Sequence, residues 1–178
     1  LVEEIAGEHE YLAVVHADAN GLGGIVRDFL GSLDQLDSIH EAADRYARFS
    51  DNIETATVGA LRAALEPLRN NCHKDKLPFR LLVCAGDDVT LLLNAKDAVS
   101  FAKTFLATFE QTSAEGFSKV AKEIHPSNKA LTACAGIVFC HRKYPYARAY
   151  ELCESLTSFA KDETQRSASA LAFHRITS

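Results

Sequence analysis

The sequence predicts an α+β domain in which apolar strands are covered by amphipathic helices. Short, β-prone apolar runs bounded by glycine, proline or aspartate predict strands at residues 11–17, 79–84, 89–94, 130–140 and 169–177. Apolar residues at helical spacing predict helices at residues 25–33, 38–69, 97–111 and 145–161. The resulting order, β-α-α-β-β-α-β-α-β, contains a βαββαβ core. That core is the ferredoxin-like arrangement, here with an extra long helix and an extra C-terminal strand.

The long helix has the clearest local signals. Ser38 and Glu41 have the spacing of a capping box at its start. Its apolar positions are Ile39, Ala42, Tyr46, Phe49, Ile53, Leu61, Leu65 and Leu68. Residues 70–78 break it, and residues 115–128 read as a short helix or a loop. Pro145 suits the first turn of the last helix.

Composition limits the class of protein. The 178 residues suit one domain, 1–178, and the net charge of −5 argues against a broad basic surface for nucleic acid. No apolar run approaches the ~18 residues of a membrane span, and no signal peptide is visible. The five cysteines have no metal-site spacing, which is typical of reduced core cysteines in a cytoplasmic protein. Since the chain contains no methionine, we expect a domain excised from a larger multidomain protein.

Acidic residues stand at the ends of two predicted strands. A right-handed crossover makes the first and second strands run in the same direction, so both end at one edge of the sheet. Asp18 should therefore face the hairpin residues Asp87 and Asp88, about 70 positions away. Three carboxylates at one edge repel each other unless cations neutralise them. Mg²⁺ fits this set, and two such ions, about 3.5–4 Å apart, support nucleotidyl transfer. The alternative is a solvated Asp-Asp turn.

A glycine-rich stretch follows Asp18. Asn20, Gly21, Leu22 and Gly23 precede a helix, where backbone amides and the helix dipole favour a triphosphate. Gly86 lets the hairpin turn tightly and a nucleotide approach its backbone. A glycine-rich turn without a ligand is the alternative.

Two further side chains are candidates for the same edge. Lys161 lies near the end of the last helix, where a cation also suits the helix dipole without any ligand. His16 shares a strand face with Asp18 and is interpreted as a packed strand histidine.

These motifs together resemble the palm domain, of the second-palm type with a GGDD motif, in the large subunit of type III CRISPR effector complexes. That palm belongs to the nucleotidyl-cyclase superfamily, which includes the GGDEF diguanylate cyclases. The segment HADANGLG (16–23) resembles the family's Asp-x-Asn-x-x-Gly strand end, and AGDD (85–88) resembles its hairpin. Residues 131–163 resemble the later strand, the proline and the helix ending in Ala-Lys. The closing strand, residues 170–177, also matches.

The resemblance implies a nucleotidyltransferase of the cyclic oligoadenylate synthase type, which joins ATP molecules through 3′–5′ bonds into second messengers for antiviral defence. Asp18, Asp87 and Asp88, with the backbone carbonyl of Ala19, would hold two Mg²⁺ or Mn²⁺ ions. Gly21, Leu22 and Gly23 would offer backbone to phosphates, and Lys161 would reach the triphosphate. The implied partners are ATP, a second palm in the same protein or a homodimer, and other effector subunits with guide and target RNA. No membrane is involved.

Two departures from the family pattern keep alternatives open. Ala85 replaces the first glycine of GGDD, which is tolerable if φ at that position is negative. The other departure is that this sequence contains one palm and no partner palm. Both departures keep open the alternative of a catalytically silent palm that binds nucleotide or has a purely structural role. A diguanylate cyclase is disfavoured, because its guanine-reading asparagine falls on Val26 and its next acid on Arg27.

Overall fold

The computed structural model describes residues 2–6, 10–34, 36–70, 77–120 and 130–177. It contains five strands and five helices within those ranges. The strands are β1 (Tyr11–Ala19), β2 (Phe79–Ala85), β3 (Asp88–Asn94), β4 (Ala133–His141) and β5 (Ala170–Arg175). The helices are α1 (Val2–Ala6), α2 (Leu22–Leu33), α3 (Ile39–Asn70), α4 (Ala98–Val120) and α5 (Tyr146–Glu163).

The strands form one sheet in the order β2-β3-β1-β4-β5. β1 is antiparallel to both of its neighbours, β3 and β4, whereas β4 and β5 are parallel. Because β2 is also antiparallel to β3, β1 and β2 point the same way with β3 between them. The α+β, ferredoxin-like prediction with an additional C-terminal strand is confirmed, and both β1 and the β2–β3 turn reach the same edge of the sheet.

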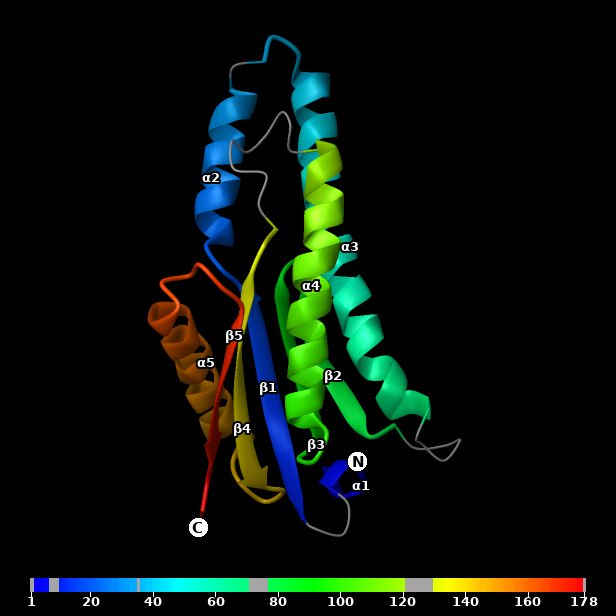
Figure 1. Cartoon of the computed structure of the whole chain (residues 1–178), viewed down its shortest axis with the longest axis vertical. Helices are drawn as coiled ribbons and strands as arrows, with labels where there is room; N and C mark the ends of the chain where they lie inside the picture. The colour runs from blue at the N-terminus through cyan, green and yellow to red at the C-terminus, as the bar shows by residue number, and fades with distance from the viewer. Residues whose placement is uncertain (1, 7–9, 35, 71–76, 121–129, 178) are drawn as a thin grey trace.

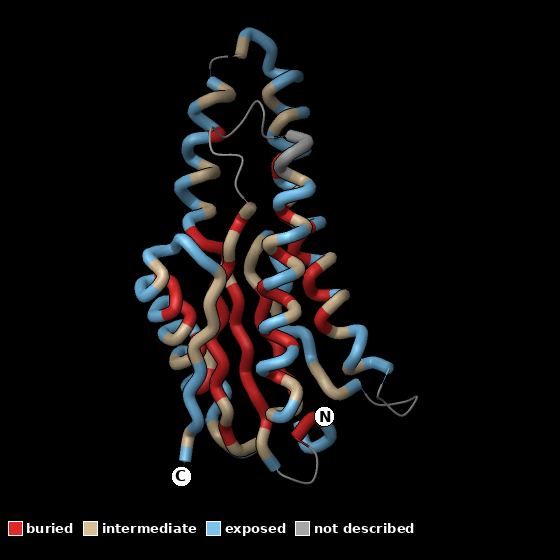
Figure 2. Tube along the Cα trace, in the orientation of Figure 1, coloured by how far each residue is buried: buried red, intermediate tan, exposed pale blue. Residues whose placement is uncertain are grey.

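Helices cover both faces of this sheet (Figure 1). One face packs against α3 and α4 through a core that includes Val15, Leu91, Phe105 and Ile137. The other face packs against α5 and α1. Alternate residues of β1 therefore enter different cores, and Figure 2 shows the central strands buried along most of their length.

The first turns of α3 are exposed although they carry apolar residues. Ile39 and Tyr46 belong to the apolar positions at helical spacing, but they are 81% and 48% exposed. Figure 1 shows the reason: α2 and the start of α3 rise beyond the edge of the sheet, where no strand lies beneath them. The helical periodicity is right, and burial begins only at Phe49, whose ring stacks on Phe29 at 4.4 Å between centroids.

The predicted capping residue is in place. The backbone amide of Glu41 donates to Ser38 Oγ at 3.4 Å. Several boundaries differ from expectation: β1 continues to Ala19, α2 begins at Leu22, β4 begins at Ala133 and α4 continues to Val120. The short helix α1 was not predicted. Residues 121–128 of the predicted short helix or loop lie outside the described residues.

The cysteines are mostly in the core, as expected. Cys134, Cys140 and Cys153 are buried, but Cys84 is exposed because β2 is an edge strand. Cys72 lies outside the described residues. Among the described helices, none combines the length and the apolar character needed to cross a bilayer.

Candidate functional site

The β2–β3 hairpin has a two-residue turn, Gly86-Asp87, between the paired residues Ala85 and Asp88. Gly86 has φ +61°, in the left-handed region that favours glycine, while Asp87 has no positive φ. A positive φ at only the first turn residue is the pattern of a type II′ turn. Ala85 also has no positive φ, so the backbone there accepts an alanine.

The tip of this hairpin reaches the end of β1. The backbone amide of Ala19 donates to Asp87 Oδ2 at 3.2 Å. Ala17 pairs with Val89 across the sheet, which brings Asp18 and Asp88 to neighbouring positions at the same edge. The predicted convergence of residues far apart in sequence is therefore present.

Burial at this end of the sheet makes the ionised forms of Asp87 and Asp88 less favourable. Burial, followed by the hydrogen bond with Asp18 and its charge, raises the pKa of Asp87 to about 6. The pKa of Asp88 is also raised, mainly by burial, although His16 opposes the shift. Acidic groups held in this way favour a bound cation.

Lys161 supplies one buried positive charge at this edge. The residue is only 6% exposed, and it forms an ion pair with the carboxylate of Asp18. Its Nζ also donates to the carbonyl of Ala19 at 2.8 Å. The Lys161 ammonium therefore lies beside Asp18 Oδ2 and the Ala19 carbonyl oxygen, two atoms that the family resemblance assigns to a metal ion.

The glycine loop ends in the first turn of α2. Gly21 caps the helix with φ +68°, without a side-chain cap, and its carbonyl accepts from the amides of Gly24 and Ile25. The first amides of a helix have no intrahelical acceptor, so those of Leu22 and Gly23 are suited to an anion. A Cβ added at Gly23 would meet no atom within 4 Å, which shows open space on that side.

An open pocket of about 430 Å³ joins these elements. Its lining residues come from β1, the glycine loop, the hairpin tip and the end of α5: Asp18, Ala19, Gly21, Leu22, Gly23, Val26, Asp87, Lys161 and Arg166. The pocket therefore combines carboxylates, two cationic side chains and a helix N-terminus within one cleft.

Asn20 has a different position from the one predicted for a phosphate contact. Its side-chain amide donates to Thr132 Oγ1 at 2.9 Å and to the carbonyl of Ala168 at 3.0 Å. The residue is 6% exposed and is not among the described residues that line the pocket. Asn20 therefore ties the end of β1 to the segments before β4 and β5.

Asp88 is also not among the described residues that line the pocket. Its Oδ1 lies 3.3 Å from His16 Nδ1, and the same nitrogen lies 3.0 Å from Thr90 Oγ1. His16 is 8% exposed and meets the ring of Tyr150 edge to face, as expected of a packed strand histidine. The hairpin acids thus have different surroundings: Asp87 faces the cleft, and Asp88 lies beside His16.

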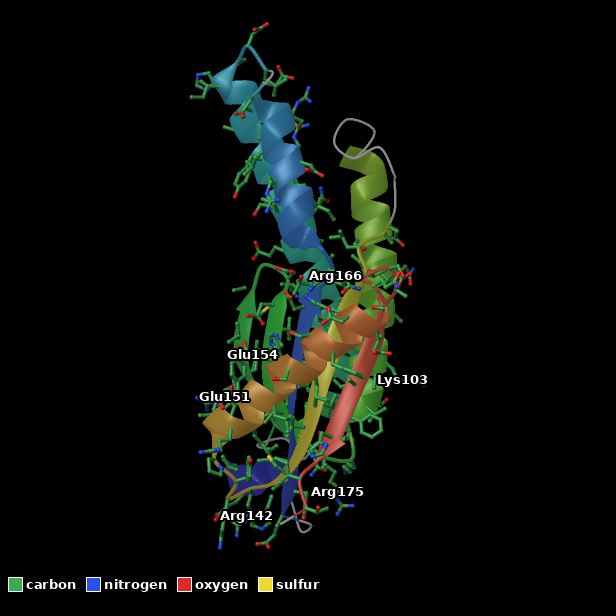
Figure 3. All side chains as sticks on the ribbon, turned by 90° about the vertical axis from the view of Figure 1, so that its left-hand side faces the viewer. Lys103, Arg142, Glu151, Glu154, Arg166 and Arg175 are labelled. Carbon is green, nitrogen blue, oxygen red and sulfur yellow. The ribbon has the colours of Figure 1, made fainter. Side chains whose placement is uncertain are left out.

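One pocket residue was missed in the sequence: Arg166 lines the cleft, although it belongs to no recognisable motif. Val26, which falls on the guanine-reading position of the diguanylate cyclase pattern, also lines the cleft. Arg166 comes five positions after Lys161, and its φ of +57° turns the chain back so that its amide donates to the Lys161 carbonyl at 2.8 Å. Figure 3 shows Arg166 at the end of α5 beside the upper edge of the sheet. The one sequence signal for Arg166 is that it is a basic residue shortly after Lys161.

Oxygen atoms of the kind that Mg²⁺ prefers lie together at this end of the sheet. Among the described residues, no three His, Cys, Asp or Glu side chains are arranged to hold a metal ion alone. The predicted set of three carboxylates is therefore not a complete metal cluster, because Asp88 lies against His16. Asp18, Asp87 and the carbonyl of Ala19 form a partial set, and Mg²⁺ in proteins commonly adds substrate phosphates and water.

Comparison with solved structures shows the same fold in much larger chains. The Csm1–Csm4 cassette in complex with pppApA matches with a TM-score of 0.61 and 17% identity, over 91% of this chain and 21% of that one. The cassette in complex with cA4 gives 0.58 and 18%, over 86% and 20%. Csm1 in T. onnurineus gives 0.58 and 18%, over 93% and 21%. The chain thus spans about one fifth of the length of these proteins.

The family comparison covers most of the chain. A search of curated proteins finds no match. Residues 11–170, which run from the first residue of β1 to the first residue of β5, match the family described as Cas10/Cmr2, second palm domain. The chain belongs to the Cas10/Cmr2 second palm domain family.

Proposed function

We propose that this domain binds ATP with Mg²⁺ and contributes a nucleotidyl-transfer site to a type III CRISPR effector complex, where 3′–5′ cyclic oligoadenylates are made. The observation that carries the proposal is the pocket in which Asp18 and Asp87 face Lys161, Arg166 and the first turn of α2. Family membership supports it, as do the solved Csm1–Csm4 cassettes that hold pppApA and cA4.

The residues divide the work according to their chemistry. Asp18, Asp87 and the Ala19 carbonyl are the oxygens that would hold the metal. When bound, Mg²⁺ supplies the activation of a 3′-hydroxyl and the neutralisation of the leaving pyrophosphate. The amides of Leu22 and Gly23 bind phosphate oxygens at the positive end of α2. Lys161 and Arg166 neutralise the remaining phosphate charge.

The wall of the pocket has no group that reads guanine at the diguanylate cyclase position. Val26 lines the cleft where that pattern has its guanine-reading asparagine. An apolar side chain cannot accept or donate the hydrogen bonds that read the guanine edge. We therefore expect no preference for GTP over ATP.

One palm supplies one half of a site that must hold two nucleotides. The second half comes from another palm in the longer protein or from a second copy of this chain. Guide and target RNA and other effector subunits act through the longer protein. A nucleotide-binding palm without turnover is the alternative, and product formation separates the two.

The test is calorimetric titration of ATP into the protein with Mn²⁺, followed by mass spectrometry of products. We expect metal-dependent ATP binding that Asp87→Asn weakens by more than about 100-fold, since a direct ligand should exceed the effect of a residue behind one. Glu10→Gln, at the far end of β1, is the control and should bind like the wild type. ATP binding that is the same without metal and in Asp87→Asn would contradict the proposal.

A further inference from the structure

The inner face of α5 carries three buried polar residues at four-residue spacing. Cys153, Thr157 and Lys161 are 0%, 3% and 6% exposed. The charged residues Glu151 and Glu154 are exposed on the same helix (Figure 3). Buried polar groups at a regular helical spacing require partners on the element that they face.

Each of the three side chains lies within hydrogen-bond distance of a backbone carbonyl of β1. Cys153 Sγ lies 3.3 Å from the carbonyl oxygen of Val14 and 3.1 Å from that of Gly136 on β4, so its one S–H is shared between two strands. Thr157 Oγ1 lies 3.1 Å from that of His16. Lys161 Nζ lies 2.8 Å from that of Ala19. The contacts therefore advance along helix and strand together, toward the pocket.

The two repeats match in length. Four helical residues rise about 6 Å, and two strand residues rise about 6.6 Å. The step from Cys153 to Thr157 therefore accompanies the step from Val14 to His16. Lys161 then spans one residue more of the strand, which the length of its side chain allows. A shift of α5 along β1 would break all three contacts at once.

Gly136 on β4 leaves room for α5 to lie close to the sheet. A Cβ at this position would lie 2.1 Å from the carbonyl oxygen of Cys153 and 2.8 Å from Thr157 Oγ1. Only a glycine allows this approach, because real Cβ atoms do not come so near to backbone oxygen. The short side chain of Thr157 can reach the strand because the helix is this close.

We propose that Thr157 is a positioning residue for the nucleotide site, because its hydrogen bond to the His16 carbonyl fixes where α5 delivers the Lys161 ammonium. The proposal rests on the proposed function insofar as Lys161 binds ATP. Thr157 itself is not among the described residues that line the pocket.

A second buried threonine offers a matched control. Thr57 on α3 is 0% exposed, and its hydroxyl donates to the Ile53 carbonyl at 3.0 Å. Thr157 Oγ1 lies 3.0 Å from the Cys153 carbonyl oxygen and 3.1 Å from that of His16, so its one hydroxyl hydrogen is shared between the local contact and the contact to β1. Thr157→Val and Thr57→Val thus remove the same local contact, but only Thr157→Val removes the contact between helix and strand.

The first experiment measures ATP affinity with Mn²⁺ and the midpoint of chemical unfolding for both variants and for Thr157→Ser. We expect about tenfold weaker ATP binding in Thr157→Val, equivalent to one hydrogen bond. Thr157→Ser keeps the hydroxyl and should restore most of the affinity. Thr57→Val should lose stability without losing ATP affinity. Equal ATP affinity in Thr157→Val and Thr57→Val would overturn the inference.

The second experiment does not depend on ATP. Reductive methylation of lysines, read residue by residue with mass spectrometry, reports how well the Lys161 ammonium is protected. We expect slow methylation of Lys161 in the wild type and Thr57→Val, and several-fold faster methylation in Thr157→Val. Unchanged protection in Thr157→Val overturns the positioning role. A wild type that protects Lys161 but binds no ATP would contradict the proposed function and leave the positioning role supported.

Discussion

Two charged clusters lie at opposite ends of β1, and their surroundings differ. At the start of the strand, the Arg142 guanidinium bonds Glu3 at 2.6 Å and Glu10 at 2.9 Å. At the other end, Lys161 faces Asp18 and Asp87 in the pocket. Figure 3 shows Arg142 near the bottom of the sheet and Arg166 near its top.

The electrostatic consequences have opposite signs. The hydrogen bond from Arg142 lowers the pKa of Glu10, whose carboxylate is exposed to water. Burial and Asp18 raise the pKa of Asp87 to about 6. The first cluster is a group of solvent-exposed ion pairs. It connects α1, the residue before β1 and the turn after β4. The second holds negative charge where the fold disfavours it, which is typical of binding sites.

Removing the Lys161 ammonium from the pocket should destabilise the fold more than removing the Arg142 guanidinium from the other end of β1. We expect Lys161→Met to lower the free energy of unfolding by about 2 kcal/mol at pH 7, because it leaves the Asp18 carboxylate without its buried partner. Urea unfolding in the presence of a chelator measures this. A loss no larger than that of Arg142→Met would break the distinction between the two ends.

The two ends should also respond oppositely to pH in metal-free protein. Since the pKa of Asp87 is raised from its ordinary 3.8 to about 6, the wild type loses stability as pH rises from about 4 to about 6. Asp87→Asn should therefore gain stability relative to the wild type over that window. Thermal unfolding at a series of pH values checks the prediction.

Glu10→Gln provides the opposite case. Because the pKa of Glu10 is lowered from 4.5, its contribution is present above that pH and disappears as pH falls through the lowered value. The variant should be less stable than the wild type at pH 7 and equal to it in acid. Parallel pH profiles for the two variants would show that the clusters do not differ.

Arg142→Met should have the smallest effect. Its two carboxylate partners are 77% and 51% exposed, and exposed ion pairs contribute little to stability. We expect a small fall in the unfolding midpoint that vanishes in about 1 M salt, where the Debye length is about 3 Å. A large, salt-independent loss of stability would indicate that the Arg142 ion pairs stabilise the fold more than their exposure suggests.

The local features of the fold were predictable because they depend on neighbouring residues. The apolar run of β1, the Ser38 cap and the Gly86 turn follow from short-range sterics and hydrogen bonding. The antiparallel hairpin and a right-handed crossover then place Asp18 opposite Asp87. The acidic edge of the site could therefore be inferred before the structure.

Other properties depend on distances that sequence patterns do not contain. Whether Ile39 is buried depends on how far α3 extends past the sheet, and whether Asn20 faces the cleft depends on Thr132 and Ala168. Arg166 reaches the pocket through a left-handed turn at a non-glycine residue.

The sequence by itself determined the order of strands and helices along the chain, the hairpin and the acids at its tip, since these follow from local preferences and chain handedness. Tertiary structure alone decided that Lys161 is buried against Asp18. That placement requires α5 to lie in one register on β1, set by Cys153 and Thr157, at the close approach that Gly136 permits. Such a register is a sum of packing contacts between distant segments, and periodicity along the chain cannot specify it.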